Sequence, residues 1–427
     1  MFILIYCIKP PFKCFKIANT STHELYIYIY KMNKNISRLH SIAQKSERII
    51  IGLMSGTSLD GLDVALCSLA GSGLNTKIKL LKFSTVSYDA DFKTEIKNVF
   101  SKKEVDLKKL TLLNPYIGLR HASIINDLLK KWNIKNEDVD IIASHGQTIY
   151  HAPKILLGQD KFGNATLQIG DGDHIAVNTG IITVSDFRQK HIAAGGEGAP
   201  LAVYGDYLIF GKQGEDRILL NIGGIANFTF LPGSIDASNI LCTDVGPGNT
   251  IMDAYMQQHF SDKYFDENAT VALQGNINHS LLSVLKENIF FTKDFPKTTG
   301  PELFNLTYLL ESQNKSGTNN LSTYDVMATL NKFSADMIVA AITASIKSKN
   351  VVLHSSGGGM HNPLLMQNIK DQLPDISFKT TDDLNINPDA KEAILFALLA
   401  NEALCGGETN FGKAAPSVSM GKVSFAK

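Results

Sequence analysis

The sequence lacks an excess of charge of either sign, because 41 Lys and Arg residues balance 41 Asp and Glu residues. Without a net positive charge, the chain offers no overall basic field to nucleic acid or anionic lipid. A long apolar run is missing as well: the run at residues 2–8 ends before Pro10-Pro11, whereas a helix needs roughly 20 residues to span a bilayer. These absences predict a protein with no nucleic acid and no membrane among its partners.

Cysteine is scarce and scattered. The five cysteines form no C-x-x-C pair and have no metal-ligand spacing, a pattern typical of a reducing compartment such as the cytoplasm. Low-complexity linkers are absent too. Hydrophobic residues make up 44% and charged residues 19%, which are ordinary globular proportions. A chain of 427 residues is therefore long enough for two compact domains.

The first tenth of the chain differs in composition from the rest. Residues 1–46 hold seven basic residues and one acidic residue, Glu24, so the remaining 381 residues carry a net charge of −6. The segment has neither the basic start nor the small-residue cleavage site of a secretory signal. We therefore expect residues 1–46 to be an atypical N-terminal extension, either disordered or lying upstream of a translation start at Met32.

Two stretches repeat one pattern of strand, glycine-rich turn and returning strand. The first covers residues 48–69 with its turn at 55–61, and the second covers residues 217–231 with its turn at Gly223-Gly224. This repetition within a mixture of strands and helices predicts two related α/β lobes.

The glycine-rich turns are candidates for phosphate binding. Gly56 and Gly61 have the spacing G-x-x-x-x-G, but Leu62 stands where a Walker-type loop needs lysine. Glycines still let backbone N–H groups approach phosphate oxygens, and Thr57 and Ser58 add hydroxyl donors. A single turn of this kind could be no more than a decorated hairpin.

Three such turns are hard to explain by packing. Residues 221–227 form a second turn, and Gly357 to Gly359 form a third glycine stretch after a strand. Together they predict a nucleotide clamped between two lobes. Asp60 in the first turn is expected to face Mg²⁺ directly or through its water ligands.

Polar residues also follow two apolar strands between the repeats. Residues 139–143 end at Ser144 to Thr148, and residues 181–184 end at Ser185-Asp186. Polar groups at strand ends are where α/β proteins build their sites. Asp186 taken alone could equally cap a helix or turn.

Eight runs of the sequence, in order, resemble the anhydro-N-acetylmuramic acid kinase family. They are residues 52–63 (GLMSGTSLDGLD), 144–148 (SHGQT), 168–171 (QIGD), 186–188 (DFR), 194–201 (AGGEGAPL), 221–227 (NIGGIAN), 244–249 (DVGPGN) and 357–363 (GGGMHNP). The resemblance implies an α/β fold of two ribonuclease-H-like lobes, the actin-like ATPase and sugar-kinase fold, around a nucleotide cleft. It also implies ATP and Mg²⁺ as cofactors, 1,6-anhydro-N-acetylmuramic acid as the substrate, a homodimer and a bacterial cytoplasm.

The resemblance also implies roles for individual residues. Asp186 falls on the family's catalytic carboxylate. The implied cofactor-binding residues are Gly56, Thr57, Ser58, Leu59, Asp60, Gly61, Leu62, Asp63, Asn221, Gly223, Gly224, Asn227, Gly357, Gly358, Gly359 and Asn362. The implied substrate-binding residues are Ser144, His145, Gln147, Thr148, Arg188 and Asp244.

Several of these residues have alternative interpretations. His145 alone would more often be a core or turn histidine, Arg188 could make a surface salt bridge, and Asp244 could cap the following helix. The chain also departs from the family pattern: His191 replaces an acidic residue, Glu197 replaces glutamine and Gly172 replaces proline. We expect His191 and Glu197 to exchange a charge within one loop.

The chemistry explains why one carboxylate could suffice. Water must attack the anomeric carbon while O6 leaves, and an inverting hydrolase uses two carboxylates for this. If the γ-phosphate captures O6, a single base is enough, and we expect Asp186 to be that base.

The predicted domains are the extension (1–46), lobe I (47–205 plus 386–427, with the first phosphate motif and Asp186) and lobe II (206–385, with the second phosphate and adenosine motifs). Residues 326–347 and 389–404 have the spacing of amphipathic helices. Two other functions stay open: another actin-fold N-acetylhexosamine kinase, or a non-sugar ATPase of the actin or chaperone type. The run Asp186-Phe187-Arg188 beside residues 144–148 favours a sugar kinase.

Overall fold

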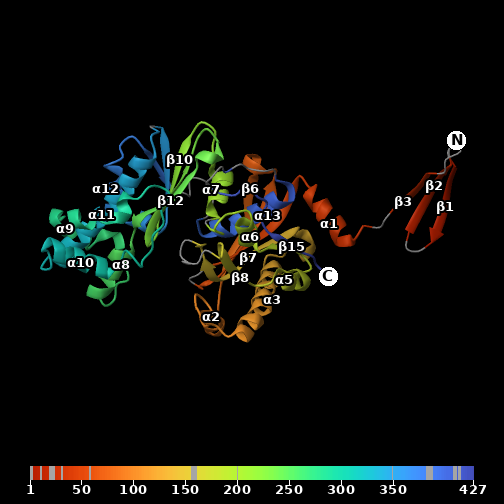
Figure 1. The fold of residues 1–427 in the computed structure, drawn as a ribbon, viewed down its shortest axis with the longest axis horizontal. Helices are drawn as coiled ribbons and strands as arrows, with labels where there is room; N and C mark the ends of the chain where they lie inside the picture. Colours follow the sequence, from red (N-terminus) through yellow and green to blue (C-terminus); the bar gives the residue numbers. More distant parts are fainter. Residues whose placement is uncertain are drawn as a thin grey trace.

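A computed structural model describes most of the chain: residues 3–9, 12–18, 25–29, 32–56, 59–154, 161–199, 201–348, 350–380, 388–406, 411 and 415–427. Near the N-terminus, β1 (Ile3–Lys9), β2 (Phe12–Ala18) and β3 (Leu25–Ile29) pair as an antiparallel sheet. Figure 1 shows this sheet apart from the body of the molecule. Whether residues 1–46 are a dispensable extension stays a prediction.

The last part of that segment packs against the body. Helix α1 (Lys34–Ala43) buries Ile42, which is 3% exposed. Asn35 Nδ2 donates to the Ala426 carbonyl at 2.9 Å, and Arg38 donates to the Gly180 carbonyl at 3.0 Å. Residues 34–43 thus belong structurally to the lobe that follows them.

The sheet of lobe I has the order β6-β5-β4-β7-β9-β15, with β8 added beside β7. Its strands are β4 (Glu47–Ser55), β5 (Gly61–Ala70), β6 (Lys77–Ser87), β7 (Ile141–Ala152), β8 (Ala165–Ile169), β9 (Ile182–Ser185) and β15 (Lys422–Ser424). Strands β4, β5 and β6 pair antiparallel, whereas β4, β7 and β9 run parallel.

The sheet of lobe II repeats this arrangement as β12-β11-β10-β13-β14. Its strands are β10 (Asp216–Ile222), β11 (Ile225–Leu231), β12 (Leu241–Pro247), β13 (Val351–Ser356) and β14 (Ser377–Thr380). Here too the first three strands are antiparallel, and β10, β13 and β14 run parallel. The duplication predicted from the glycine-rich hairpins is confirmed.

Helices cover the two sheets (Figure 1). Those of lobe I are α1, α2 (Ala90–Lys97), α3 (Leu107–Lys131), α5 (Gly172–Thr179), α6 (Phe187–Ala193), α7 (Ala202–Phe210) and α13 (Lys391–Cys405). Those of lobe II are α8 (Thr250–His259), α9 (His279–Leu285), α10 (Leu306–Ser316), α11 (Thr323–Ser345) and α12 (Pro363–Lys370). The two helices predicted from spacing correspond to α11 and α13.

Side chains along β4 alternate between two hydrophobic clusters. Ile50 and Met54 face the cluster that holds α7 and α13, whereas Ile51 and Leu53 face the cluster of α2 and α3. This period of two is what a strand buried on both faces requires. The sheet is therefore the middle layer of three.

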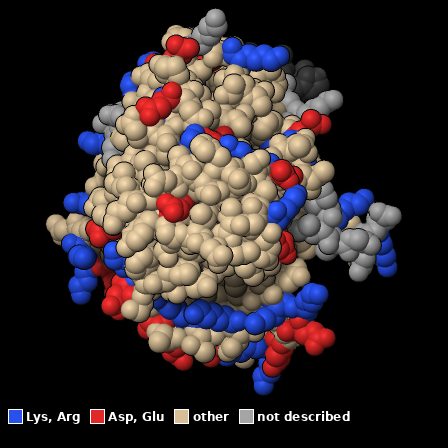
Figure 2. All heavy atoms as spheres, turned by 90° about the vertical axis from the view of Figure 1, so that its left-hand side faces the viewer, with Lys and Arg blue, Asp and Glu red and all other residues tan. Residues whose placement is uncertain are grey.

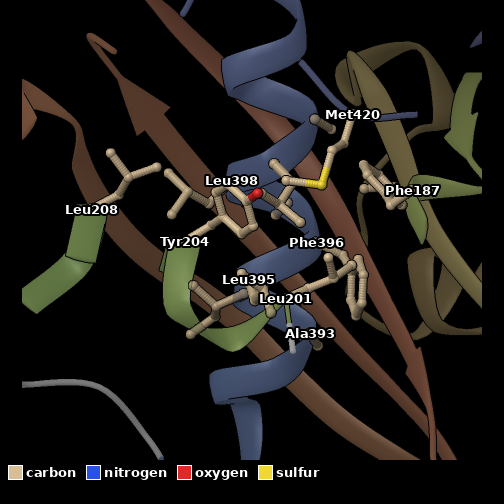
Figure 3. Close-up of a cluster of buried hydrophobic side chains, with 14 of the residues drawn as sticks. Phe187, Leu201, Tyr204, Leu208, Ala393, Leu395, Phe396, Leu398 and Met420 are labelled. Atoms are coloured by element: carbon tan, nitrogen blue, oxygen red, sulfur yellow. The ribbon is translucent and has the colours of Figure 1, made fainter. Parts of the chain in front are cut away.

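Helix α13 is buried on all sides rather than amphipathic, because every residue from Ala393 to Asn401 is buried. It packs directly on β4: a Cβ on Gly52 would lie 1.8 Å from the Ala393 carbonyl oxygen. Figure 3 shows Leu398 of α13 beside Tyr204 of α7, whereas Phe396 lies on the side of Phe187.

Helix α7 joins the two lobes. Asp206, 3% exposed, contacts Lys391 of α13 at 2.7 Å and accepts a hydrogen bond from Thr229 of β11 at 3.0 Å. The boundary predicted between residues 205 and 206 falls inside this helix.

Helix α11 is the one helix among the described residues that is long and apolar enough to span a membrane. Most of it is buried in lobe II, where its apolar window is 78% buried. It is therefore placed as a core helix. Figure 2 views the lobe II end of the molecule, where side chains of both charges are interspersed around a largely uncharged centre.

Candidate active site

Three strands of lobe I end at one edge of the sheet and bring three predicted motifs together. Because β4, β7 and β9 are parallel, Ser55 lies opposite Gln147, and Ser144 lies opposite Ser185. Asp186 follows Ser185 directly. The first glycine turn, the SHGQT run and the DFR run thus meet at the carboxyl ends of the strands, where open α/β sheets place their sites.

Asp186 stands between β9 and α6 with a left-handed backbone, φ 58° and ψ 45°. Such a conformation costs a non-glycine residue energy and is often found at functional sites. Its carboxylate makes no cap hydrogen bond to α6 but accepts one from Lys422 Nζ at 2.5 Å. The structure therefore gives no support to the helix-cap interpretation.

The neighbouring Phe187 anchors this position. Its ring lies 5.3 Å from that of Phe396 between ring centroids, and it is 1% exposed. Figure 3 shows Phe187 directed toward α13. Burial of Phe187 holds the adjoining Asp186 at the end of the strand.

Arg188 of α6 connects strand β7 with the loop that follows α6. Its Nε donates to His145 Nε2 at 2.9 Å, and its Nη1 donates to the Gly198 carbonyl at 2.7 Å. Burial, and then the positive charge of Arg188, lowers the pKa of His145 to about 3, so the imidazole is neutral and can accept this hydrogen bond. Arg188 makes no salt bridge within the described residues, so the surface salt-bridge interpretation fails.

His191 is also neutral. Its Nδ1 accepts a hydrogen bond from Gly198 N at 2.9 Å, and burial, followed by the charge of Arg188, lowers its pKa to about 4. A buried imidazole next to a guanidinium does not take a proton at neutral pH, so His191 brings no charge to this loop, and the expectation that His191 and Glu197 exchange a charge stays a prediction.

The other members of the SHGQT run are enclosed. Ser144 and Gln147 are fully buried, and Gln147 is hydrogen-bonded to Ser55 and Gly56. Thr148 Oγ1 accepts from Gln168 Nε2 at 3.2 Å. Contact of these residues with a sugar stays a prediction.

The described residues of the first phosphate turn present mostly backbone groups to a ligand. Leu59 and Leu62 are buried, while Asp60 is exposed. Thr57 and Ser58 lie outside the described residues. A Cβ on Gly61 would lie 2.5 Å from the Val86 carbonyl oxygen, so packing alone demands glycine there.

Asp63 turns its carboxylate away from the turn, to Thr85, whose Oγ1 donates a hydrogen bond at 2.5 Å. Burial raises the pKa of Asp63 despite this hydrogen bond, and Asp389 raises it further. Within the described residues no group of three His, Cys, Asp or Glu side chains has the arrangement of a metal site. A metal near Asp60 would need phosphate oxygens or water as further ligands.

The second phosphate turn and the adenosine motif lie together in lobe II. A Cβ on Gly357 would lie 2.6 Å from Asn221 Oδ1, and one on Gly359 would lie 2.3 Å from Ile222 Cγ2. Asn362 caps α12, because its Oδ1 accepts from Leu365 N at 3.0 Å. Packing therefore explains Gly357 and Gly359, and capping explains Asn362.

Three other glycines are not explained in this way. A Cβ on Gly223 or Gly224 would meet no atom closer than 3.6 Å, and one on Gly358 none closer than 4.0 Å. None of the three has a positive φ. The protein itself would therefore tolerate a side chain at each of these three positions. What the three glycines share is open space above their backbone. This is the surface that a planar base or a phosphate needs for close approach.

Asp244 lies in β12 opposite Asn227 of β11. Its Oδ2 accepts from Thr299 N at 3.0 Å, and burial raises its pKa, as does the nearby Glu302. The cap of α8 is Asn249, so Asp244 does not cap that helix.

Sequence reasoning missed two carboxylates. Glu302 lies near Asp244, and Glu392, in the first turn of α13, lies near Arg188 and Asp63; burial raises the pKa of Glu392. The signal available for Glu392 was an acidic residue at the start of an otherwise apolar helix.

Two lobes with the same strand order, each carrying a glycine-rich turn after its first strand, define the class: actin-like ATPases and sugar kinases, which use ATP. Comparisons with known proteins give the family. A family model described as "Anhydro-N-acetylmuramic acid kinase" matches residues 48–422. The chain belongs to the anhydro-N-acetylmuramic acid kinase family.

Individual relatives agree with this assignment. Proteins named "Anhydro-N-acetylmuramic acid kinase" from Pseudoalteromonas atlantica and Caldanaerobacter subterraneus are 58% and 38% identical over 399 and 398 residues, which are 92% and 91% of this chain and 100% of each relative. Among solved structures, the chain is similar to the activator of 2-hydroxyisocaproyl-CoA dehydratase from Clostridium difficile (13% identity, TM-score 0.35, covering 83% of this chain and 95% of that chain). It is also similar to hexokinase from Schistosoma mansoni (11% identity, TM-score 0.34, covering 84% and 86%).

Proposed function

We propose that this protein uses ATP and water to open 1,6-anhydro-N-acetylmuramic acid and to phosphorylate its O6, giving N-acetylmuramic acid 6-phosphate in the recycling of cell-wall peptidoglycan. The observation that carries the proposal is Asp186, held at a strand end in a left-handed conformation with no cap hydrogen bond. The open glycines 223, 224 and 358 supply the matching nucleotide surface. The family relationship supports the choice of sugar.

The residues of this chain divide the work between the two lobes, proposed as 47–205 plus 386–427 and 206–385. Asp186 accepts a proton from the water that attacks C1, and the C1–O6 bond breaks as the new C1–O bond forms. Bound Mg-ATP supplies the γ-phosphoryl group that O6 takes. The backbone of residues 56–61 and of Gly223-Gly224 orients the phosphates, since phosphoryl transfer depends mainly on positioning and charge neutralisation.

Other assignments complete the proposal. Asp60 faces Mg²⁺, directly or through water, because it is exposed at the first turn. Arg188 is a partner for developing phosphate charge or for the substrate carboxylate. A cytoplasmic homodimer is part of the proposal on the strength of the family relationship.

One assay tests the reaction. The purified protein is mixed with Mg-ATP and 1,6-anhydro-N-acetylmuramic acid in H₂¹⁸O, and the product is identified by mass. We expect a sugar 6-phosphate carrying one ¹⁸O at C1. Phosphorylation of the sugar without solvent oxygen would indicate instead a kinase of an intact N-acetylhexosamine, and ATP hydrolysis without any sugar product would indicate an ATPase of the actin or chaperone type.

A further inference from the structure

Next to the first phosphate turn lies a hydrogen-bonded network of four buried polar side chains that the proposed reaction does not use. Ser55, Tyr88, His121 and Gln147 are all 4% exposed or less, and they come from β4, the end of β6, α3 and β7. Ser55 Oγ lies 2.5 Å from Gln147 Oε1, Tyr88 Oη lies 2.9 Å from Ser55 Oγ, and His121 Nε2 lies 3.0 Å from Tyr88 Oη. Polar groups enclosed in a hydrophobic lobe are costly unless they are fully paired.

The donor and the acceptor of every hydrogen bond in this network can be assigned. Gln147 Nε2 faces two carbonyl oxygens, those of Gly56 at 3.4 Å and Thr148 at 3.3 Å, so the amide nitrogen must be on that side and Oε1 must face Ser55. The Ser55 hydroxyl therefore donates to Gln147, and its oxygen accepts from Tyr88. Because the Tyr88 proton is then used, His121 must donate to Tyr88 through Nε2.

The protonation states agree with this assignment. Burial lowers the pKa of His121 to about 4, so the ring is neutral and carries one N–H, which this network places on Nε2. His121 Nδ1 is buried with no hydrogen-bond partner among the described residues, as a nitrogen without a proton can be. Burial raises the pKa of Tyr88, so the phenol keeps its proton at neutral pH.

Tyr88 also holds the other side of the turn. Its backbone N–H donates to the Asp60 carbonyl at 3.1 Å. The hydrogen bonds that start from its side chain end at the Gly56 carbonyl, which accepts from Gln147. Gly56 and Asp60, the described residues on either side of the turn, are thus each held by hydrogen bonds that lead back to Tyr88.

We infer that Tyr88, His121 and Ser55 are positioning residues, which act through Gln147 to hold Gly56 at the position from which its turn receives the nucleotide phosphates. The inference rests on the proposed role of residues 56–63 in ATP binding. It also gives Gln147 a role that needs no contact with the sugar. Each side chain of this network donates to the next, from His121 through Tyr88, Ser55 and Gln147 to the Gly56 carbonyl. Removal of any member therefore leaves its neighbours without a hydrogen-bond partner.

The first test removes a single hydroxyl. Tyr88→Phe should raise the dissociation constant of Mg-ADP, measured by calorimetry on the full chain, about tenfold, and raise KM for ATP while KM for the sugar changes less than about twofold. The matched control is Tyr308→Phe in lobe II, whose hydroxyl donates to the Leu285 carbonyl at 2.5 Å. It should lower the melting temperature without changing Mg-ADP binding.

A second pair of variants tests whether His121 donates its hydrogen bond to Tyr88. His121→Gln keeps an N–H that can donate to Tyr88, whereas His121→Leu does not, so Gln should preserve nucleotide affinity and Leu should weaken it. If Tyr88→Phe does not fold, this pair decides the question. Equal Mg-ADP affinity for the two His121 variants, or unchanged affinity for Tyr88→Phe, overturns the inference and leaves the proposed function standing. Failure of the unaltered protein to bind Mg-ADP would instead overturn the nucleotide site itself.

Discussion

At the scale of single residues, the conformation of Asp186 is more informative than its type. Aspartate before a helix usually caps it, and here it does not. Its carboxylate is instead held by Lys422 from the last strand, at 2.5 Å. A strained backbone is often found at functional sites, which agrees with the proposed role of Asp186 as the base.

Replacing Asp186 by Asn should lower kcat by about 10³-fold, because an amide cannot accept the proton from water. Binding of Mg-ADP, measured by calorimetry, should stay unchanged. Asp91→Asn, an exposed carboxylate in the first turn of α2, is the control and should keep full activity. Sugar phosphorylation by Asp186→Asn at the normal rate would remove Asp186 from the role of base.

At the scale of elements, the glycine turn after β13 separates packing from ligand contact. Gly359 has Ile222 Cγ2 against it, at 2.3 Å from an added Cβ, whereas Gly358 has open space. Neighbouring residues of one short segment therefore have glycine for different reasons.

The variants Gly358→Ala and Gly359→Ala should behave differently. Gly359→Ala overpacks the contact with Ile222 and should cost about 1–3 kcal/mol of stability, measured by urea unfolding. Gly358→Ala should leave stability unchanged or slightly higher and should weaken Mg-ADP binding about tenfold, because a methyl group would occupy the space above the backbone. Unchanged nucleotide affinity in Gly358→Ala would argue against a ligand at this surface.

At the scale of the whole molecule, buried neutral histidines tie stability to pH. Burial lowers the pKa of His121 and His191 to about 4 and that of His145 to about 3, against about 6.5 in an unfolded chain. Between these values the unfolded chain binds protons that these folded histidines do not, so their contribution to the free energy of unfolding decreases as the pH falls from about 6.5 to about 4.

Substitution of one histidine should weaken this dependence. For His191→Gln we expect the loss of stability between pH 7 and pH 5 to be smaller by about 2 kcal/mol than for the unaltered protein, measured by urea unfolding at both pH values. The exposed His279→Gln is the control. Groups such as Asp253, whose pKa burial raises to about 6, change the free energy of unfolding in the opposite sense. All variants keep these groups, so their contribution cancels in the comparison. An identical pH dependence for His191→Gln would contradict the expectation.

The N-terminal segment is also a property of the whole chain. A chain that starts at Met32 keeps α1 and its contacts with Gly180 and Ala426, so we expect full activity and an unchanged melting temperature. A chain that starts at Glu47 loses the burial of Ile42 and should be less stable by about 2 kcal/mol. Loss of activity in the Met32 chain would show that residues 1–31 contribute to function.

Much of this molecule was determined by local sequence. The apolar runs of the strands, the glycines at tight turns and the repetition of strand, turn and strand depend on near neighbours, so they predicted two related lobes and the position of Asp186 at a strand end. That His191 is neutral could not be seen from the sequence, because its burial depends on the tertiary structure.

Only the tertiary structure decided which polar groups pair with one another and which glycines face open space. Lys422 reaches Asp186 across 236 positions of the chain, and Ser55 reaches Gln147 across 92. The open space at Gly358, in contrast to the packed Gly359, depends on where β10 lies. Hydrogen bonds and contacts act over a few ångströms in space, and the sequence by itself does not state which distant segments come that close.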